Sequence, residues 1–211
     1  ELSDDAMTVV LRQRRFVYSG AAGDARWAVP VSLRASVEGR PVEERVLLDG
    51  PEASCRFPGP VDWVVVNDGG WGFYRTRYSD DLTRRLTAAG LPEVLTPLER
   101  LQLLGDTWAA VVAGAANLSD WVAVASAVAA EADPDVWGSI GAVLHALDLM
   151  GDESDRDAVR AFARELAGPV WARVGWTPGP GEDERTATAR GGILTVLAGT
   201  GRDGKTVAGA A

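Results

Sequence analysis

Residues 61–78 read VDWVVVNDGGWGFYRTRY, and the change of composition inside this stretch organises the whole chain. The apolar run VDWVVV at residues 61–66 is typical of a strand that is buried on both faces. Asn67-Asp68-Gly69-Gly70 follows, and Asp-Gly and Gly-Gly pairs tolerate the positive φ angles of tight hairpin turns. The sequence therefore predicts a β-hairpin with its turn at residues 67–70.

The second strand of this hairpin would carry aromatic side chains on both of its faces. Tyr74 and Tyr78 fall on one face, whereas Phe73, Arg75 and Arg77 fall on the other. These residues could form a ligand platform, but a base-stacking platform needs a basic groove beside it, and the chain as a whole is acidic. We therefore interpret the aromatic rings as packing, with arginine stems covering apolar surface.

The residues before this stretch also indicate short strands. Residues 27–36 alternate apolar and polar side chains, and residues 7–17 and 42–48 are rich in apolar and β-branched types. Pro30 has no N–H to donate, so its strand should lie at a sheet edge or carry a bulge there. Several short strands separated by turns predict a small β-sandwich over residues 1–80.

Near residue 80 the hydrophobic period changes from two to that of a helix. Thr96-Pro97-Leu98-Glu99 is a capping box with proline at the first helical position. Further helices are indicated at Ser119, at Asp133-Pro134, over residues 154–167 with Pro169 ending or kinking that helix, and over residues 182–198. Short loops between such helices predict antiparallel neighbours that stack into a HEAT-like α-solenoid over residues 81–211. The fold class is thus mixed, an all-β part followed by an all-α part.

Composition restricts the partners and the compartment. Thirty Asp and Glu residues against 21 Lys and Arg leave a net charge of −9, which repels nucleic acid. No apolar run reaches the roughly 18 residues of a membrane span, and no signal peptide is visible. A single cysteine fits a reducing compartment. Only Lys205 is a lysine, as the codon usage of a GC-rich genome would produce, so we expect a cytoplasmic bacterial protein.

Catalytic residues are not expected in this chain. A catalytic zinc needs three protein ligands, usually with at least two histidines or thiolates. The chain has one histidine, His145, and one cysteine, Cys55, so no catalytic, cofactor-binding or metal-binding residue is predicted. We expect His145 to lie on a predicted helix as a packed or half-exposed residue, and Cys55 to be inert and buried in a predicted strand. A Ser-His-Asp triad through His145 would lack a Gly-x-Ser-x-Gly elbow.

A formal phosphate-loop motif lies near the C-terminus. GTGRDGKT at residues 199–206 matches the pattern G-x-x-x-x-G-K-[ST]. The phosphate-binding mechanism requires a strand before this motif and a helix after it. Here a predicted helix precedes the motif, so we interpret the match as a coincidence.

Four motifs, in order and spacing, resemble the C-terminal half of the zinc-dependent aminopeptidases of the aminopeptidase N (gluzincin) family. They are LRQRRF (11–16) with RWAVPVSLRA (26–35), WVVVNDGGWGFYRTRY (63–78), ERLQLLGDTWAAVVAG (99–114) and VWARVGWTPGPGEDERTATARGGIL (170–194). The chain departs from the family pattern at Thr76, where valine is usual, and at Ala189, where leucine is common.

The resemblance implies that the chemistry lies outside this chain. The family's catalytic domain carries a His-Glu-x-x-His helix and a Gly-x-Met-Glu-Asn strand, and neither motif is present here. The chain would be the β-sandwich and the first portion of the helical domain, which caps the active-site chamber in the family. The implied partners are the missing catalytic domain of the same polypeptide and, in the parent enzyme, a peptide substrate and zinc. A first residue of Glu1 rather than Met also suggests a piece of a longer chain.

The resemblance also indicates one candidate chamber residue, Arg190, because late helical arginines of the family can lie near the bound peptide. Its alternative role is a salt bridge to Glu182, Asp183 or Glu184 on the same predicted helix. Two other functions stay open for the chain: an independent sandwich-and-solenoid module that binds a protein partner, and a hydrolase that uses His145. An upstream His-Glu-x-x-His segment in the same reading frame would favour the aminopeptidase over both.

Overall fold

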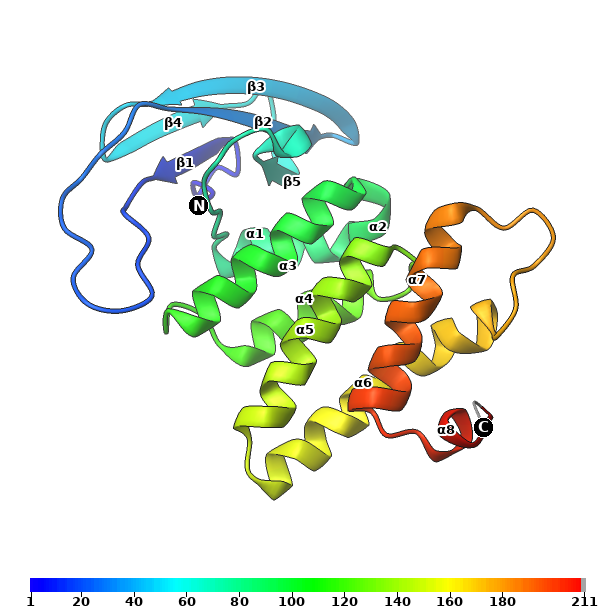
Figure 1. Cartoon of the computed structure of the whole chain (residues 1–211). Helices are drawn as coiled ribbons and strands as arrows, with labels where there is room; N and C mark the ends of the chain where they lie inside the picture. The colour runs from blue at the N-terminus through cyan, green and yellow to red at the C-terminus, as the bar shows by residue number, and fades with distance from the viewer. Residues whose placement is uncertain (210–211) are drawn as a thin grey trace. The chain divides into compact units, whose positions relative to one another are not determined.

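The computed structural model describes residues 1–209, in which the strands precede the helices as predicted (Figure 1). The strands are β1 (Thr8–Arg12), β2 (Val29–Val37), β3 (Arg40–Leu48), β4 (Glu52–Arg56) and β5 (Val61–Val66). The helical elements are η1 (Asp68–Gly70), α1 (Asp80–Ala88), α2 (Leu91–Val94), α3 (Pro97–Val112), α4 (Leu118–Val128), α5 (Pro134–Met150), α6 (Glu153–Val174), α7 (Glu184–Leu194), η2 (Thr195–Thr200) and α8 (Gly204–Gly209). The mixed fold class, strands followed by helices, is confirmed.

The strands form two small antiparallel sheets. β1 pairs with β4, and β2 lies between β3 and β5. Apolar side chains from both sheets belong to one buried cluster, which includes Val9, Leu33, Phe57, Val61 and Val64. Burying such a side chain contributes about 1.5–3 kcal/mol, so this cluster is the main source of stability for the strands. The sandwich itself stays a prediction, as does the solenoid.

The pairing of β2 explains how the strand tolerates Pro30. β3 pairs with β2 along Val29–Val37, whereas β5 pairs only with Leu33–Val37. Pro30 therefore lies where β2 has a partner strand on one side only, which is the edge position that the sequence predicts. The irregularity in the pairing lies elsewhere, between Ser36 and Val37.

The predicted hairpin at residues 67–70 is wrong in its second strand. Asn67, Gly69 and Gly70 do adopt positive φ angles of 68°, 73° and 73°. However, β5 ends at Val66, η1 is a single 3-10 turn, and residues 71–79 continue to α1 without joining a sheet. Side chains from α3 bind the backbone of the turn and, at Thr76, of the segment where the second strand was expected, as described below.

The aromatic residues after the turn divide into two pairs. Tyr74 and Tyr78 pack against the buried cluster of the strands, as the prediction of packing requires. Trp71 and Phe73 are 90% and 109% exposed, so neither belongs to the core of the strands, and packing of these two rings against another domain stays a prediction. Without a paired strand, the period of two no longer decides which side chains are buried.

Most predicted helix starts are found. Thr96 accepts a hydrogen bond from the amide of Glu99, and Asp133 accepts two from the first turn of α5. Asp152 caps α6 in the same way, and α6 continues through Pro169 instead of ending there. Ser119 is not a cap, because α4 begins one residue earlier. Local capping chemistry therefore predicted the helices better than it predicted the hairpin.

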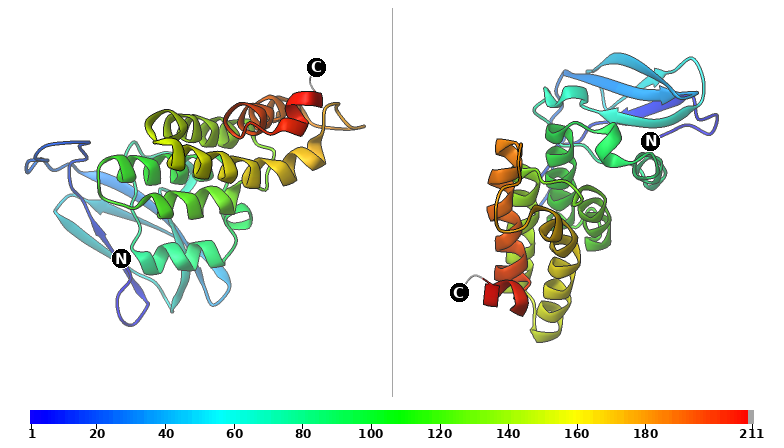
Figure 2. Two further views of the ribbon diagram at one scale, coloured as in Figure 1. Left: turned by 90° about the horizontal axis from the view of Figure 1, so that it is seen from below. Right: turned by 90° about the vertical axis from the view of Figure 1, so that its right-hand side faces the viewer.

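By its contacts, the chain forms two compact units, Glu1–Trp121 and Val122–Ala211. Within the second unit, α5, α6 and α7 pack alongside one another, as both views of Figure 2 show. Their buried side chains include Trp137, Ile140 and Ile193, which are fully shielded from solvent. The domain division predicted from sequence, at residues 80 and 81, follows the change from strands to helices and stays a prediction.

Candidate functional site: a glycine-rich loop held on helix α3

Residues 67–76 form a loop that several side chains hold by hydrogen bonds, and we call it the glycine loop. It lies against one face of α3, where Glu99, Gln102 and Asp106 are spaced three and four residues apart and therefore point to the same side. We call these three side chains the α3 clamp. Each of them binds the backbone of the glycine loop.

Glu99 joins the loop to the strands. Its carboxylate accepts hydrogen bonds from the amide of Gly69 at 2.9 Å and from the amide of Thr96 at 2.8 Å. The guanidinium of Arg34, on β2, donates to both carboxylate oxygens at 3.0 and 2.8 Å and to Asp68 at 2.6 Å. Glu99 is 4% exposed, so strand, loop and helix meet at a buried ion pair.

These contacts set the charge of Glu99. Burial alone would raise its pKa, but the amide donors of Gly69 and Thr96 and the guanidinium of Arg34 outweigh burial and lower it. Glu99 is therefore a carboxylate whose hydrogen bonds are satisfied, held in place as a structural group. It is not poised to exchange a proton near neutral pH.

Asn67 shapes the loop from within. Its amide oxygen accepts a hydrogen bond from the Gly72 amide at 2.7 Å, and its amide nitrogen donates to the Gly72 carbonyl at 3.0 Å. Gln102 of the α3 clamp donates to the Gly70 carbonyl at 3.1 Å. A Cβ atom on Gly70 would lie 2.7 Å from Leu98 Cδ2, so only glycine allows this close approach to α3.

Asp106 holds the far end of the loop. Its carboxylate accepts hydrogen bonds from the amide and the hydroxyl of Thr76, at 2.8 and 3.0 Å, and from Arg75 at 3.3 Å. Burial raises the pKa of Asp106, and the donors of Thr76 and Arg75 offset only part of that effect. Thr76, where the family usually has valine, thus adds a hydroxyl donor to a buried carboxylate.

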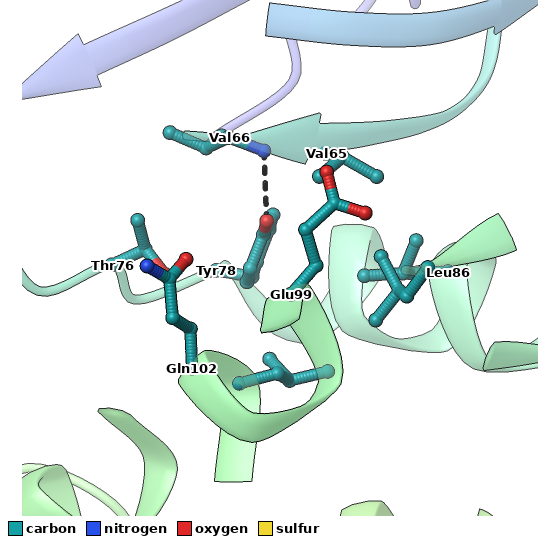
Figure 3. Close-up of a pocket in the computed structure, with 9 residues that line it drawn as sticks. Val65, Val66, Thr76, Tyr78, Leu86, Glu99 and Gln102 are labelled. Atoms are coloured by element: carbon teal, nitrogen blue, oxygen red, sulfur yellow. Dashed lines mark hydrogen bonds between the residues drawn. The ribbon is translucent and has the colours of Figure 1, made fainter. Parts of the chain in front are cut away.

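A small cavity lies between β5 and α3, as Figure 3 shows. Its volume is about 10 Å³, which is room for one water molecule at most. The hydroxyl of Tyr78 accepts a hydrogen bond from the Val66 amide at 2.8 Å, and burial raises the pKa of Tyr78. Tyr78 thereby bonds an amide at the end of β5 that a hairpin strand could have paired. The cavity is too small for an organic ligand.

Gln13 closes the long loop between β1 and β2. Its side-chain nitrogen donates to the carbonyls of Trp27, Leu48 and Gly50, at 2.8, 3.2 and 2.8 Å. Its side-chain oxygen accepts a hydrogen bond from the Trp27 amide at 3.0 Å. The motifs LRQRRF and RWAVPVSLRA are thus joined in space by one glutamine.

Replacing Gln13 should loosen this loop. We expect Gln13→Ala to destabilise the first unit by about 2 kcal/mol, because four hydrogen bonds of roughly 0.5–1.5 kcal/mol each are lost and water replaces part of them. Urea unfolding followed by circular dichroism measures the change. The exposed neighbour Arg14 provides the control, and Arg14→Ala should stay within about 0.5 kcal/mol of wild type. Equal midpoints for the two variants would contradict the role given to Gln13.

Cys55 and His145, considered above as possible ligands, belong to other elements than the glycine loop. Cys55 is buried in β4, where burial raises the pKa of its thiol, and His145 is exposed on α5. Within residues 1–209, no three His, Cys, Asp or Glu side chains are grouped so that they could hold a metal ion. The described side chains therefore offer no grouping that fits a zinc ion.

Arg190 forms the salt bridge that the sequence offered as its alternative role. Its guanidinium donates to Glu182 at 2.5 and 2.7 Å and to the carbonyls of Gly175 and Val174 at 2.9 and 3.2 Å. Its side chain is 11% exposed, so it ties the end of α6 to the loop before α7. A role for Arg190 beside a bound peptide stays a prediction.

A substitution tests the structural role of Arg190. We expect Arg190→Ala to lower the thermal unfolding temperature of this chain, because the α6 carbonyls and Glu182 lose their shared donor. Arg190→Lys should recover only part of the loss, since a single ammonium group cannot reproduce the forked geometry. Differential scanning calorimetry tests this. An unchanged unfolding temperature for Arg190→Ala would contradict the structural role.

The second unit also contains an open cleft of about 500 Å³ that Trp171 and Trp176 line together with Arg164 and Lys205. The motif at residues 199–206 borders it. A π-helical turn and the short helix α8 form this motif, and Asp203 accepts hydrogen bonds from the amide and the hydroxyl of Thr206. The element that leads into the motif is α7 followed by a π-helical turn and not a strand, so the structure supports its interpretation as a coincidental match.

Sequence reasoning did not find the contacts between the motifs. Glu99, Gln102 and Asp106 carried a signal, because their spacing places three polar groups on one side of an otherwise apolar helix. No such signal exists for Arg34 and Gln13, because nothing along the chain indicates which distant groups these two side chains bind.

The fold thus consists of two small sheets followed by a helical region, with a glycine-rich loop held on α3 between them. The profile of the ERAP1-like C-terminal domain family matches residues 63–211, which is more than half of the chain. The chain belongs to this family. The predicted resemblance to the C-terminal part of the aminopeptidase N family is thereby confirmed.

Several relatives have similar sequences. The chain is 28% identical to Aminopeptidase M1 of Arabidopsis thaliana over 209 residues, covering 92% of this chain and 24% of the relative. It is 29% identical to Puromycin-sensitive aminopeptidase of Caenorhabditis elegans over 205 residues, covering 92% and 21%. Aminopeptidase N of Plutella xylostella is 24% identical over 201 residues, covering 90% and 21%. The chain thus spans about a quarter of the length of these curated relatives.

From Glu1 to Gly209, no helix has both the length and the apolar composition that crossing a bilayer requires.

Proposed function

We propose that this chain is the non-catalytic C-terminal region of a zinc-dependent aminopeptidase, and that it scaffolds and caps the chamber in which peptides lose their N-terminal residues. The observation that carries this proposal is the family match over residues 63–211 together with relatives that are named aminopeptidases. The zinc and the residues that bind it would lie in the remaining part of the parent polypeptide.

The glycine loop supports a scaffolding role. The carboxylates of Glu99 and Asp106, which hold this loop, accept hydrogen bonds from backbone amides, a hydroxyl and guanidinium groups. What this arrangement achieves is rigidity between the last strand and the first long helix. A chamber wall needs such rigidity, because a site loses precision when the elements that support it shift by about 1 Å.

Activity assays test the proposal. The chain alone, supplied with zinc and an aminoacyl-nitroanilide, should show no turnover, whereas the full-length protein should hydrolyse the same substrate and lose activity with a chelator. Turnover by the chain alone that survives His145→Ala and zinc removal would overturn the assignment to a non-catalytic region. Loss of that turnover in His145→Ala would favour the hydrolase.

The capping role needs its own measurement. The full-length protein should discriminate between peptides of increasing length, and a version that ends before α4 should lose this discrimination while it still hydrolyses the small nitroanilide. If length discrimination survives the deletion, the helices do not limit the chamber. A full-length protein with no peptidase activity would instead favour an independent interaction module.

A further inference from the structure

The loop between β1 and β2 presents arginine and aromatic side chains to solvent. Residues 13–28 contain no strand or helix, and loops longer than about 12–15 residues inside compact regions are usually functional. Phe16 and Tyr18 are 38% and 56% exposed, although large aromatic side chains are normally more buried. We call residues 14–26 the arginine–aromatic loop.

This loop is held in a defined conformation. Gln13 fixes its base through the hydrogen bonds described above. The rings of Phe16 and Tyr18 meet edge to face with centroids 5.0 Å apart. Arg75 lies over the Phe16 ring at 5.1 Å and is itself held by Asp106 of the α3 clamp. A surface that is ordered before binding loses less entropy when a partner docks.

The local charge is opposite to that of the chain. The loop contains three arginines, Arg14, Arg15 and Arg26, and one carboxylate, Asp24, whereas the net charge of the whole chain is −9. Arg14 and Arg15 are exposed, and neither is part of an ion pair found within residues 1–209. Aromatic residues and arginine are the types most enriched at the energetic centres of protein interfaces.

We propose that the arginine–aromatic loop, together with Arg75, is the surface on which an acidic, partly apolar face of the catalytic part of the parent polypeptide docks. This inference rests on the proposed function, and on relatives about four times longer than the chain. A protein face of a few carboxylates suits three arginines. A nucleic acid would in addition meet the repulsion of the acidic remainder of the chain.

Limited trypsin digestion tests the proposal, because trypsin cuts after Arg14, Arg15 and Arg26. Cleavage in this loop should be at least tenfold slower in the full-length protein than in the 211-residue chain, as followed by mass spectrometry. In the full-length protein, the double variant R14E/R15E should restore cleavage after Arg26 at least fivefold. The matched control is R40E/R45E, two exposed arginines on β3, which should leave the rate after Arg26 unchanged.

Each other outcome overturns the proposal. Equal cleavage of the loop in the full-length protein and in the chain would show that nothing docks there, while peptidase activity of that protein would leave the proposed function standing. If the loop is protected but the full-length protein has no peptidase activity, the proposed function is wrong, and so is the proposal that a catalytic part docks on this loop. Concentration-dependent dimers of the chain that R14E/R15E abolishes would favour a second copy. Binding of a labelled thymidine oligonucleotide at 150 mM salt, lost in R14E/R15E, would favour nucleic acid.

Discussion

Glu99→Ala should destabilise the first unit by about 3 kcal/mol, because it removes one of the two carboxylates paired with Arg34 and leaves that buried network with Asp68 alone. The substitution takes from Arg34 its bidentate acceptor and from the amides of Gly69 and Thr96 their only side-chain acceptor. The capping box of α3 is lost at the same time. Urea unfolding measures the change in the free energy of unfolding.

Two further variants identify the cause. Glu93→Ala removes an exposed glutamate two turns away and should change stability by no more than about 0.5 kcal/mol. Glu99→Gln keeps an acceptor for one amide but removes the charge beside Arg34. Its loss in the free energy of unfolding should therefore lie between the losses of Glu93→Ala and Glu99→Ala. A loss below about 1 kcal/mol in Glu99→Ala would show that the ion pair does not hold the loop on α3.

The same carboxylate predicts a dependence on pH. The folded protein lowers the pKa of Glu99 below its ordinary 4.5, so the unfolded chain takes up this proton first as pH falls. The contribution of Glu99 to stability is therefore complete above about pH 4.5 and is lost as pH falls through the lower folded pKa. The difference in unfolding free energy between wild type and Glu99→Gln should shrink over that range. Asp106, with a raised pKa, acts in the opposite direction in both proteins and cancels in the difference.

Asn67→Ala should cost the first unit about 3 kcal/mol, from two separate causes. A left-handed backbone costs an ordinary L-residue roughly 1–2 kcal/mol, and Asn67 has a φ of 68°. The two hydrogen bonds to Gly72, at about 1 kcal/mol each, are also lost. Asn67 is 4% exposed, so water does not readily replace its amide. Urea unfolding of the variant measures the sum.

Glycine separates the two causes. Asn67→Gly relieves the backbone strain but also loses the hydrogen bonds, so we expect about 2 kcal/mol, less than for alanine. Glu38 offers a matched control, since it also has a positive φ, 50°, but is exposed in the turn between β2 and β3. Glu38→Ala should be close to neutral. If Asn67→Gly proves as stable as wild type, the side-chain bonds to Gly72 contribute nothing.

Local signals predicted the elements with short-range causes. The capping box at Thr96 and Glu99, the cap at Asp133 and the acidic start of α6 all depend on neighbours within a few residues, and all are found. The interior run of β5 is found at the predicted residues 61–66. The family resemblance was also available from the sequence, because order and spacing of motifs survive where overall identity is low.

The hairpin after Val66 failed for a tertiary reason. The turn residues adopt the positive φ angles that their types favour, yet whether a second strand forms depends on which groups bind the next backbone segment. Here the clamp residues Glu99, Gln102 and Asp106 bind it from α3, some thirty residues later in the chain. No pattern near residue 70 contains that information.

The sequence by itself determined that this chain has strands followed by helices, that it contains one histidine and one cysteine, and that it resembles part of an aminopeptidase. These properties follow from composition, local periodicity and motif order. Only the tertiary structure decided that Trp71 and Phe73 are exposed. It also decided that Arg190 pairs with Glu182 and that the guanidinium of Arg75 lies over the Phe16 ring. Hydrogen bonds and ion pairs act over about 3 Å in space, and distance along the chain does not predict which groups come that close.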